Sequence, residues 1–161
     1  MCSSDLERVL IFRPHNVYGP DMGLEHVIPQ FCRRLHAAVR AQPDGRVPFE
    51  IQGDGTQTRS FCYVDDLVDG VMVMRERGEH LGIYHIGTTE EITISELAQR
   101  VAGHVGREIR LIHGPAPAGG TQRRCPDIAK LGKLGYAPRV PLAKGLPPTV
   151  DWYFSQFGAA P

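Results

Sequence analysis

The sequence predicts a mixed α/β fold on three observations. Short extended apolar stretches alternate with stretches of helical apolar periodicity, which is typical of mixed α/β domains. The 18 Gly and 13 Pro residues tend to separate these stretches at turns. With 161 residues, of which 42% are hydrophobic, the chain is long enough to bury one core without disulfides or structural metals.

The chain opens on a polar segment, residues 1–6, that has no apolar period. A GTG start followed by the tail of a common short-read sequencing adapter would be translated as Met-Cys-Ser-Ser-Asp-Leu, so we expect residues 1–6 to be a non-native scar. A natural tail is the alternative. The run Arg8 to Arg13 then predicts a buried strand, and the Gly and Pro content of Asn16 to Gly23 predicts a loop.

A helix should follow, with Pro29 in its first turn. Its apolar face recurs at helical spacing in Val27, Phe31, Leu35 and Val39. Val47 to Gln52 predicts a strand that ends in the turn Gly53-Asp54-Gly55. Ser60 to Val64 predicts another extended piece.

Asp65 and Asp66 stand where acidic residues favour a helix start, and we expect this helix to end near Gly78. Its apolar face consists of Leu67, Val68, Val71, Met72 and Met74. Gly82 to Ile86 predicts the next strand, which Gly87 and a polar turn follow.

The clearest local signal is a capping box formed by Thr93 and Glu96. A hydrophobic staple between Ile92 and Leu97 accompanies it. Together they predict a helix from about Ile94 to about Val105.

The remaining elements are shorter or less regular. Arg107 to Ile112 predicts a strand, and the Gly and Pro residues of Gly114 to Gly120 predict a mobile loop. Asp127 is expected to cap a short helix. Apolar positions at helical spacing mark this helix and a last one: Ile128, Leu131 and Leu134, then Leu146, Val150, Phe154 and Phe157.

Charge, hydropathy and cysteine spacing exclude several classes of partner. The 18 basic residues balance the 18 acidic ones, which argues against nucleic acid or an anionic membrane surface as the main partner. Apolar runs such as Val9 to Phe12 fall far short of the roughly 20 residues that a membrane span needs. The four cysteines form no CxxC pair, so we expect reduced thiols in the cytoplasm, no zinc and no disulfide. A small-molecule partner is the expectation.

Two arginines stand in turn-rich rather than helical surroundings. Arg59 follows Gly53 to Thr58, and Arg124 follows Gly119 to Arg123. If folding brings them together, their planar donor groups would hold a pyrophosphate from two sides. The alternative is that each pairs with a surface carboxylate.

Four segments carry a resemblance to a known family. They are Arg13-Pro14-His15-Asn16-Val17-Tyr18-Gly19-Pro20, the run from Gly53 through Arg59 to Leu67, Tyr84-His85-Ile86-Gly87, and Arg124-Cys125-Pro126-Asp127-Ile128. In this order they resemble the C-terminal half of the NAD-dependent epimerase/dehydratase family, which are extended short-chain dehydrogenases. The pattern is most similar to UDP-glucuronate decarboxylases and sugar 4-epimerases. The resemblance covers nearly everything after Leu6 and implies the substrate-binding part of a Rossmann-like fold.

The resemblance also implies roles for individual residues. Cofactor contacts at the nicotinamide end of NAD fall to Pro14 and His15. Substrate contacts are implied for Asn16 at the sugar or phosphate, Arg59 and Arg124 at the pyrophosphate, Asp127 at the ribose, and His26, Val27 and Gln52 in the nucleotide pocket. His26 and Gln52 stand where relatives often carry Asn and an aromatic residue, so the base and the sugar stay open. For His15 and His26, a partly buried structural histidine is the alternative.

Two parts of the family's chemistry are absent from the sequence. The fragment Gly53-Asp54-Gly55 follows the wrong strand to be the Gly-rich turn of a dinucleotide fold. The family's base is a tyrosine with a lysine four residues later. At that spacing the five tyrosines are followed by Met22, Leu67, Thr88, Val140 and Phe157. We therefore expect no catalytic residue in this chain.

These observations predict a substrate-binding half over residues 7–158, with a tail at 159–161. The resemblance implies an intact homodimeric enzyme that oxidises a nucleotide sugar at C4 through bound NAD before epimerisation, dehydration or decarboxylation. We expect this chain to be a truncated gene product that is inactive alone. The alternative is a noncatalytic module that binds a nucleotide sugar or a partner protein.

Overall fold

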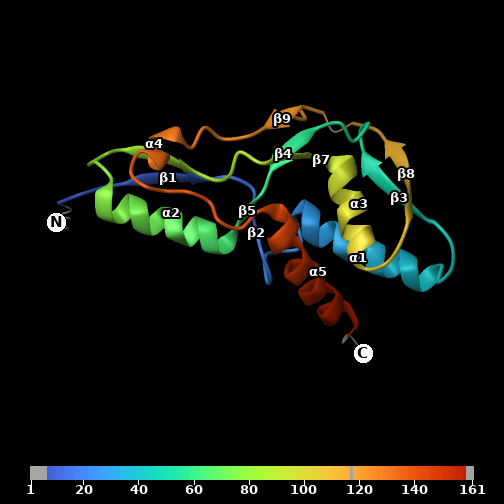
Figure 1. Ribbon diagram of the computed structural model, residues 1–161. Helices are drawn as coiled ribbons and strands as arrows, with labels where there is room; N and C mark the ends of the chain where they lie inside the picture. Colours follow the sequence, from blue (N-terminus) through green and yellow to red (C-terminus); the bar gives the residue numbers. More distant parts are fainter. Residues whose placement is uncertain (1–6, 117, 159–161) are drawn as a thin grey trace, which may run out of the picture.

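The computed structural model describes residues 7–116 and 118–158, and these residues form an elongated α/β arrangement (Figure 1). Helix α2 (Val64–Arg77), helix α4 (Ala129–Gly132) and strand β1 (Ile11–Pro14) lie at one end. At the other end lie helices α1 (Val27–Ala41) and α3 (Ile94–His104) with strands β3 (Val47–Gln52) and β8 (Ile109–Gly114). The mixed α/β prediction is confirmed. Residues 1–6, where the scar is predicted, and the tail at 159–161 lie outside the described residues.

One end of the molecule is built on a parallel strand pair. Strand β1 pairs with β6 (Ile83–Ile86), and Tyr84 and Ile86 of β6 are buried in a cluster with three other residues: Met74, Leu131 and Tyr136. The prediction that Arg8 to Arg13 forms a buried strand is wrong in two respects. The strand spans Ile11–Pro14, and all four residues are exposed, because β6 is the only partner of β1 among the described residues.

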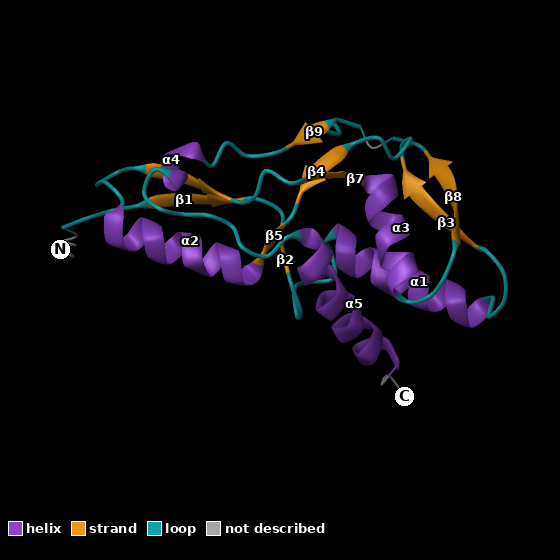
Figure 2. Cartoon of the chain, viewed as in Figure 1, coloured by secondary structure: helices purple, strands orange, loops and turns teal. Residues whose placement is uncertain are grey.

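The other end holds the larger hydrophobic cluster. Strand β3 has the predicted bounds, and its alternation buries Val47, Phe49 and Ile51 while the residues between them stay exposed. It pairs in parallel with β8. Helices α1 and α3 pack on this pair, and helix α5 (Leu142–Gly158) packs on α1 and α3 (Figure 2). The predicted helices are confirmed here, although α5 begins before Leu146 and contains Pro147 and Pro148.

Short strands connect the two ends. Strand β2 (Val17–Tyr18) pairs in parallel with β5 (Cys62–Tyr63). A three-stranded sheet places β4 (Thr58–Ser60) between β7 (Glu91–Thr93) and β9 (Arg123–Arg124). The sequence analysis missed β2, β7 and β9, and it merged β4 and β5 into one piece that ran into α2. These strands of two or three residues exist because distant segments pair, which no local periodicity reports.

Local capping and turn chemistry follow the sequence closely. The Thr93 hydroxyl accepts a hydrogen bond from the Glu96 backbone N–H at 3.1 Å, which confirms the capping box. The turn after β3 is also confirmed, since Gly53 and Gly55 have φ values of 69° and 76°. A Cβ atom on Gly55 would lie 1.9 Å from the Ser95 hydroxyl, so this turn packs directly on α3.

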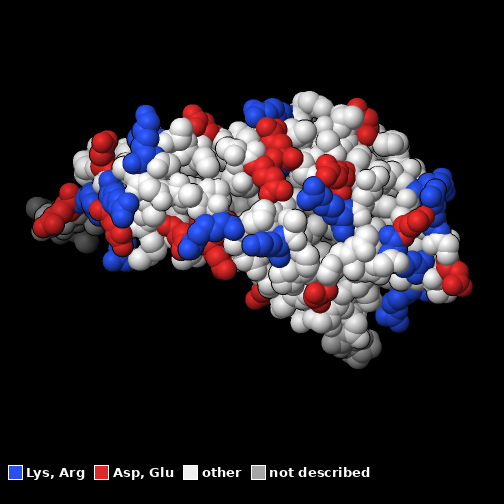
Figure 3. All heavy atoms as spheres, in the orientation of Figure 1, with Lys and Arg blue, Asp and Glu red and all other residues white. Residues whose placement is uncertain are grey.

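The surface and helices agree with the balanced composition. On the face drawn in Figure 3, basic and acidic side chains alternate around large uncharged areas. Within residues 7–116 and 118–158, no helix combines the length and the apolar character that a bilayer crossing requires.

Candidate functional site

A cleft of about 550 Å³ lies between the start of α1 and strands β4 and β9. A second hollow, about 610 Å³ in volume, adjoins it. Six residues line both: Asn16, Val17, Tyr18, Met22, His26 and Arg124. The two hollows therefore adjoin each other, and Arg124 is part of the wall that they share.

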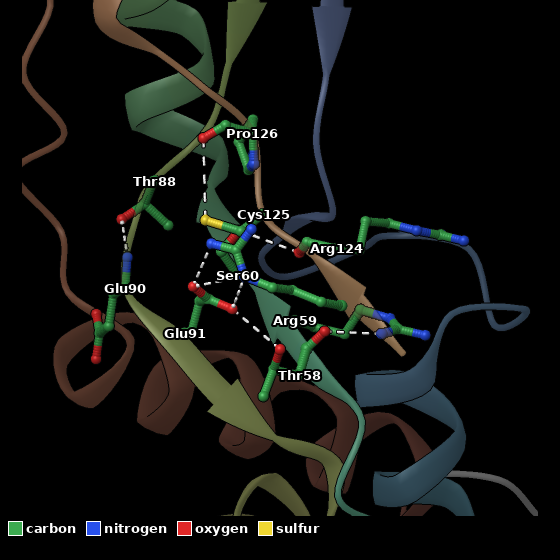
Figure 4. Close-up of polar contacts among 10 residues, drawn as sticks. Thr58, Arg59, Ser60, Thr88, Glu90, Glu91, Arg124, Cys125 and Pro126 are labelled. Atoms are coloured by element: carbon green, nitrogen blue, oxygen red, sulfur yellow. Dashed lines mark hydrogen bonds and ion pairs between the residues drawn. The ribbon is translucent and has the colours of Figure 1, made fainter. Parts of the chain in front are cut away.

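The two predicted arginines come together on neighbouring strands. Strands β4 and β9 run parallel, and Arg59 is the register partner of Arg124. Figure 4 shows both side chains extending to the same side of the sheet, away from Glu91. Both line the first cleft. The predicted proximity is thus confirmed, and their binding of a ligand stays a prediction.

The arginine pair carries positive charge that no described carboxylate neutralises. Arg59 donates through Nη1 to the backbone oxygens of Thr58 at 2.7 Å and Gln122 at 3.4 Å. The ion pairs among the described residues include neither Arg59 nor Arg124. Burial, and then the charge of Arg124, lower the pKa of Arg59. The alternative that each arginine pairs with a surface carboxylate is therefore not what the structure shows. Two adjacent cations at a cleft favour a ligand with at least two negative charges.

Asn16, just before β2, is hydrogen-bonded to strands β4 and β5. Its side-chain Nδ2 donates to the Ser60 oxygen at 2.9 Å, and its backbone oxygen accepts from the Cys62 N–H at 3.1 Å. Its φ of 41° is in the left-handed region, which asparagine tolerates better than most residues. Asn16 lines both hollows, so its side chain lies where the cleft passes from one to the other.

The remaining predicted nucleotide-pocket residues lie on the first cleft. His26, Val27 and Gln52 all line it. His26 stands at the N-cap of α1 without capping it through its side chain, and it is exposed. The alternative of a buried structural histidine is therefore wrong for His26.

The predicted cofactor residues lie on the second hollow only. Pro14 and His15 line it beside Arg124. The Nε2 atom of His15 lies 2.7 Å from Nδ1 of His85, at hydrogen-bond distance. Burial lowers the pKa of His15, and the charges of His85, Arg124 and Arg13 lower it further. A neutral His15 is thus favoured next to the arginine site.

Asp127 lies apart from the other predicted substrate residues. It lines neither hollow, and its carboxylate accepts the Ala129 N–H at 2.9 Å, at the start of α4. The carboxylate thus binds the first N–H of α4, as expected of a capping group, although Ile128 rather than Asp127 stands at the N-cap position. The ribose contact stays a prediction. Two residues, Cys125 and Pro126, lie between Asp127 and Arg124, so at full extension the two Cα atoms are about 10 Å apart.

Several cleft residues escaped the sequence analysis. Arg34 of α1 lines the first cleft and stacks its guanidinium 4.7 Å from the ring centre of Phe49. Gln57 also lines it, and its buried Oε1 has no hydrogen-bond partner among the described residues. Gln30 and Arg34 lie three and seven residues after Val27 in sequence, on the same helix face. That spacing could have predicted that these two polar side chains lie beside Val27 at the cleft.

Known proteins resemble this chain in sequence. Residues 4–87 match the family model described as the NAD dependent epimerase/dehydratase family. A GDP-L-fucose synthase of Arabidopsis thaliana is 38% identical over 144 residues, which are 87% of this chain and 44% of that protein. A UDP-glucuronic acid decarboxylase of the same plant is 37% identical over 86% of this chain and 30% of its own length. The chain thus spans less than half of these relatives.

Solved structures show the same relation. A dTDP-glucose 4,6-dehydratase from Streptomyces venezuelae, bound to NAD, matches 93% of this chain and 45% of its own chain, with a TM-score of 0.78 and 32% identity. A UDP-glucose 4-epimerase from Thermotoga maritima, bound to UDP-glucose, matches 92% and 46% with a TM-score of 0.79 and 26% identity. The family match, the fold and the arrangement of the four motifs lead to one assignment. This chain belongs to the NAD-dependent epimerase/dehydratase family and has the fold of part of an extended short-chain dehydrogenase.

Proposed function

We propose that this chain binds the nucleotide-sugar substrate of an NAD-dependent epimerase, dehydratase or decarboxylase. The observation that carries the proposal is the pair Arg59 and Arg124, which are register partners and face one cleft without a carboxylate partner among the described residues. A diphosphate bridging these two guanidinium groups would accept several charge-assisted hydrogen bonds. Its charge would also relieve the repulsion between the two cations.

The shared wall of the two hollows orients the proposed ligand. With the diphosphate at Arg59 and Arg124, the nucleoside would extend along the first cleft toward Val27, His26 and Gln52. The sugar would then lie at the junction beside Asn16. This order places the reacting end of the ligand next to the hollow that Pro14 and His15 line.

NAD is the cofactor of this family, and this chain fits only its nicotinamide end. Pro14 and His15 form an exposed or half-buried wall beside the proposed sugar position, where the nicotinamide would accept the hydride when bound. The turn Gly53-Asp54-Gly55 packs on Ser95 of α3, so it is not a phosphate-binding turn at a free helix end. The residues of this chain therefore hold the substrate and one edge of the cofactor site.

Catalytic turnover is not expected of this chain. Each of its five tyrosines lacks a lysine four residues later. Binding alone orients the sugar. Without a base to accept the proton of its hydroxyl group, the sugar is not oxidised. Incubating the chain with NAD and UDP-glucose, UDP-glucuronate or GDP-mannose should therefore give no product by chromatography. Measurable steady-state conversion would contradict this part of the proposal.

Calorimetric titration with nucleoside diphosphates tests the binding role. UDP, GDP and dTDP are the probes, because relatives carry each of these nucleotides in their names. Arg59→Ala and Arg124→Ala should each weaken binding of the preferred diphosphate about tenfold or more. Arg100→Ala, which removes an exposed charge on α3, is the matched control and should leave the affinity unchanged. Equal affinity in the Arg124→Ala variant and the wild-type chain would overturn the proposal.

The same titration identifies the base. If one diphosphate binds at least tenfold more tightly than the other two, Gln52→Ala should reduce that preference more than the overall affinity. A cytoplasmic location and a homodimeric intact enzyme remain predictions, which fractionation and sedimentation of the complete gene product would test.

A further inference from the structure

We propose that Glu91 is a positioning residue for Arg124, acting through Arg123 on the opposite face of strand β9. This inference rests on the proposed diphosphate site. It adds to that site a residue that does not contact the ligand. Glu91 lies on β7, at the far edge of the three-stranded sheet from β9, with β4 between them.

Strand β9 has little to hold it in place by itself. It has two residues, and β4 is its only strand partner among the described residues. The Thr58 N–H donates to the Gln122 oxygen at 2.9 Å, and the Ser60 hydroxyl reaches the Arg124 oxygen only at 3.5 Å. A parallel pairing this short is weak, and the residues 118–120 shortly before it are exposed. The position of Arg124 therefore depends on side-chain contacts as well.

Glu91 supplies those contacts across the whole sheet. Its carboxylate accepts the single Arg123 Nε–H, shared between the two oxygens at 3.0 and 3.2 Å, and a second bond from Arg123 Nη2 at 2.7 Å. It also accepts the Thr58 hydroxyl at 3.0 Å, so one carboxylate joins β7, β4 and β9 (Figure 4). The hydrogen bonds from Arg123 and Thr58 hold the pKa of Glu91 below its usual value.

The contact between Arg123 and Glu91 also orients Arg124, because side chains alternate along strand β9. Consecutive side chains on a strand point to opposite faces, so fixing Arg123 toward Glu91 directs Arg124 to the other face. Arg59 alternates with Thr58 in the same way, and Figure 4 shows Arg59 and Arg124 extending together away from Glu91. The Glu91–Arg123 pair thus determines that the two ligand-binding guanidinium groups stand side by side.

The sign of one substitution separates positioning from simple electrostatics. Glu91→Gln removes a negative charge close to the two arginines that are proposed to bind the diphosphate. Coulomb interaction alone therefore predicts tighter diphosphate binding. Loss of positioning predicts weaker binding. We expect calorimetry with UDP or GDP, whichever binds the wild-type chain, to show about threefold to tenfold weaker affinity for Glu91→Gln.

Two further variants complete the experiment. Arg123→Gln, at an exposed residue, should weaken binding by a similar factor although it changes the charge in the opposite direction. Glu96→Gln breaks an ion pair on α3 with the same charge change and should have no effect. In an Arg124→Ala background, Glu91→Gln should produce no additional loss, because its effect passes through Arg124. Hydrogen exchange at the Thr58 amide, which the pairing with Gln122 protects, should accelerate in both Glu91→Gln and Arg123→Gln.

The outcomes distinguish this proposal from the one it rests on. A wild-type chain that binds no nucleoside diphosphate contradicts the proposed function itself. A wild-type chain that binds, with Glu91→Gln equal to or tighter than Glu96→Gln, overturns only the positioning role. An additive loss in the double variant with Arg124→Ala overturns it as well, because Glu91 would then act by another route.

Discussion

The two hydrophobic clusters of this chain differ in how completely they are covered. The large core joins α1, α3, α5 and the β3–β8 pair, and it includes Phe31, Leu35, Phe49, Leu97 and Val150. The small core joins β6, α2 and α4 around Met74, Tyr84, Ile86, Leu131 and Tyr136. Most exposed large apolar residues belong to the elements around the small core: Ile11, Phe12, Val64, Val68, Met72, Leu81 and Ile83. Only Leu24 and Ile112 of that class lie elsewhere among the described residues.

The difference in coverage between the two cores implies that the two sides of the cleft differ in stability. Parallel strand pairs normally have both faces covered, and the β1–β6 pair does not meet that condition. The cleft wall on α1 belongs to the well-covered part, whereas His15 follows the exposed strand β1. We therefore expect the α1 side of the cleft to persist when the β1 side opens.

Two acidic side chains join the two parts. Asp66 of α2 is 2% exposed and accepts the backbone N–H groups of Arg139 at 2.8 Å and Val140 at 3.0 Å, just before α5. Glu90 accepts the Leu142 N–H at 2.9 Å, at the first residue of α5. Asp66 thus connects α2, beside the small core, to the segment before α5, which packs in the large core, and Glu90 holds the start of α5 from the segment before β7.

The largest effect should come from cutting the Asp66 connection. Asp66→Ala leaves two partly buried N–H groups without an acceptor, which should lower the free energy of unfolding by about 2–4 kcal/mol. It should also separate the transition into two steps in urea, with β1, β6 and α2 losing hydrogen-exchange protection first. Asp65→Ala, at the exposed neighbour, should change stability by less than about 0.5 kcal/mol. A single, unshifted transition for Asp66→Ala would show that the two cores do not depend on this contact.

A smaller effect is expected from the exposed face of α2. Val64, Val68 and Met72 recur every four residues and form an apolar stripe, with Val68 54% exposed. The double variant Val68→Glu/Met72→Lys should reduce self-association in light scattering while changing stability by no more than about 0.5 kcal/mol. Ile112→Glu, at an isolated exposed residue on β8, is the control and should leave association as it is in the wild-type chain. Equal self-association of the wild-type chain, the double variant and the control would show that the stripe does not mediate self-association.

Sequence reasoning succeeded where a local rule decides the structure. The alternation from Val47 to Gln52 and the capping box at Thr93 gave a strand and a helix start at the observed residues. It failed at β7 and β9, because these polar strands form through pairing between distant segments. It also failed for β1, since an apolar run predicts a buried strand only if another element covers it.

The candidate site shows the same division. The proximity of Arg59 and Arg124 is a long-range register that periodicity does not contain, and the resemblance to a family supplied it. The same resemblance implied a ribose contact for Asp127, which stays a prediction, and the structure shows its carboxylate bound to the start of α4. Neither source pointed to Glu91, because its role depends on three strands meeting.

The smallest expected effect is a pH dependence on the weakly covered side. Burial, His85, Arg124 and Arg13 all lower the pKa of His15 below its ordinary value of 6.5. The folded chain therefore binds fewer protons at His15 than the unfolded chain does as the pH falls below about 6.5. This difference makes His15 neutral to stability above that pH and destabilising below it.

Comparing urea midpoints at pH 7.5 and 5.5 would measure this contribution. The wild-type chain should lose more stability on acidification than His15→Gln, which has no titrating ring, although His15→Gln also loses the contact with His85 at both pH values. The control is His113→Gln, at an exposed histidine on β8. Its urea midpoint should change between the two pH values by as much as that of the wild-type chain. Because β1 lies beside the small core, exchange protection should fall at Phe12 and Arg13 before it falls at Leu35 of the large core. An equal loss at both places would mean that protonation of His15 is felt by the whole fold, and that the two cores open as one unit.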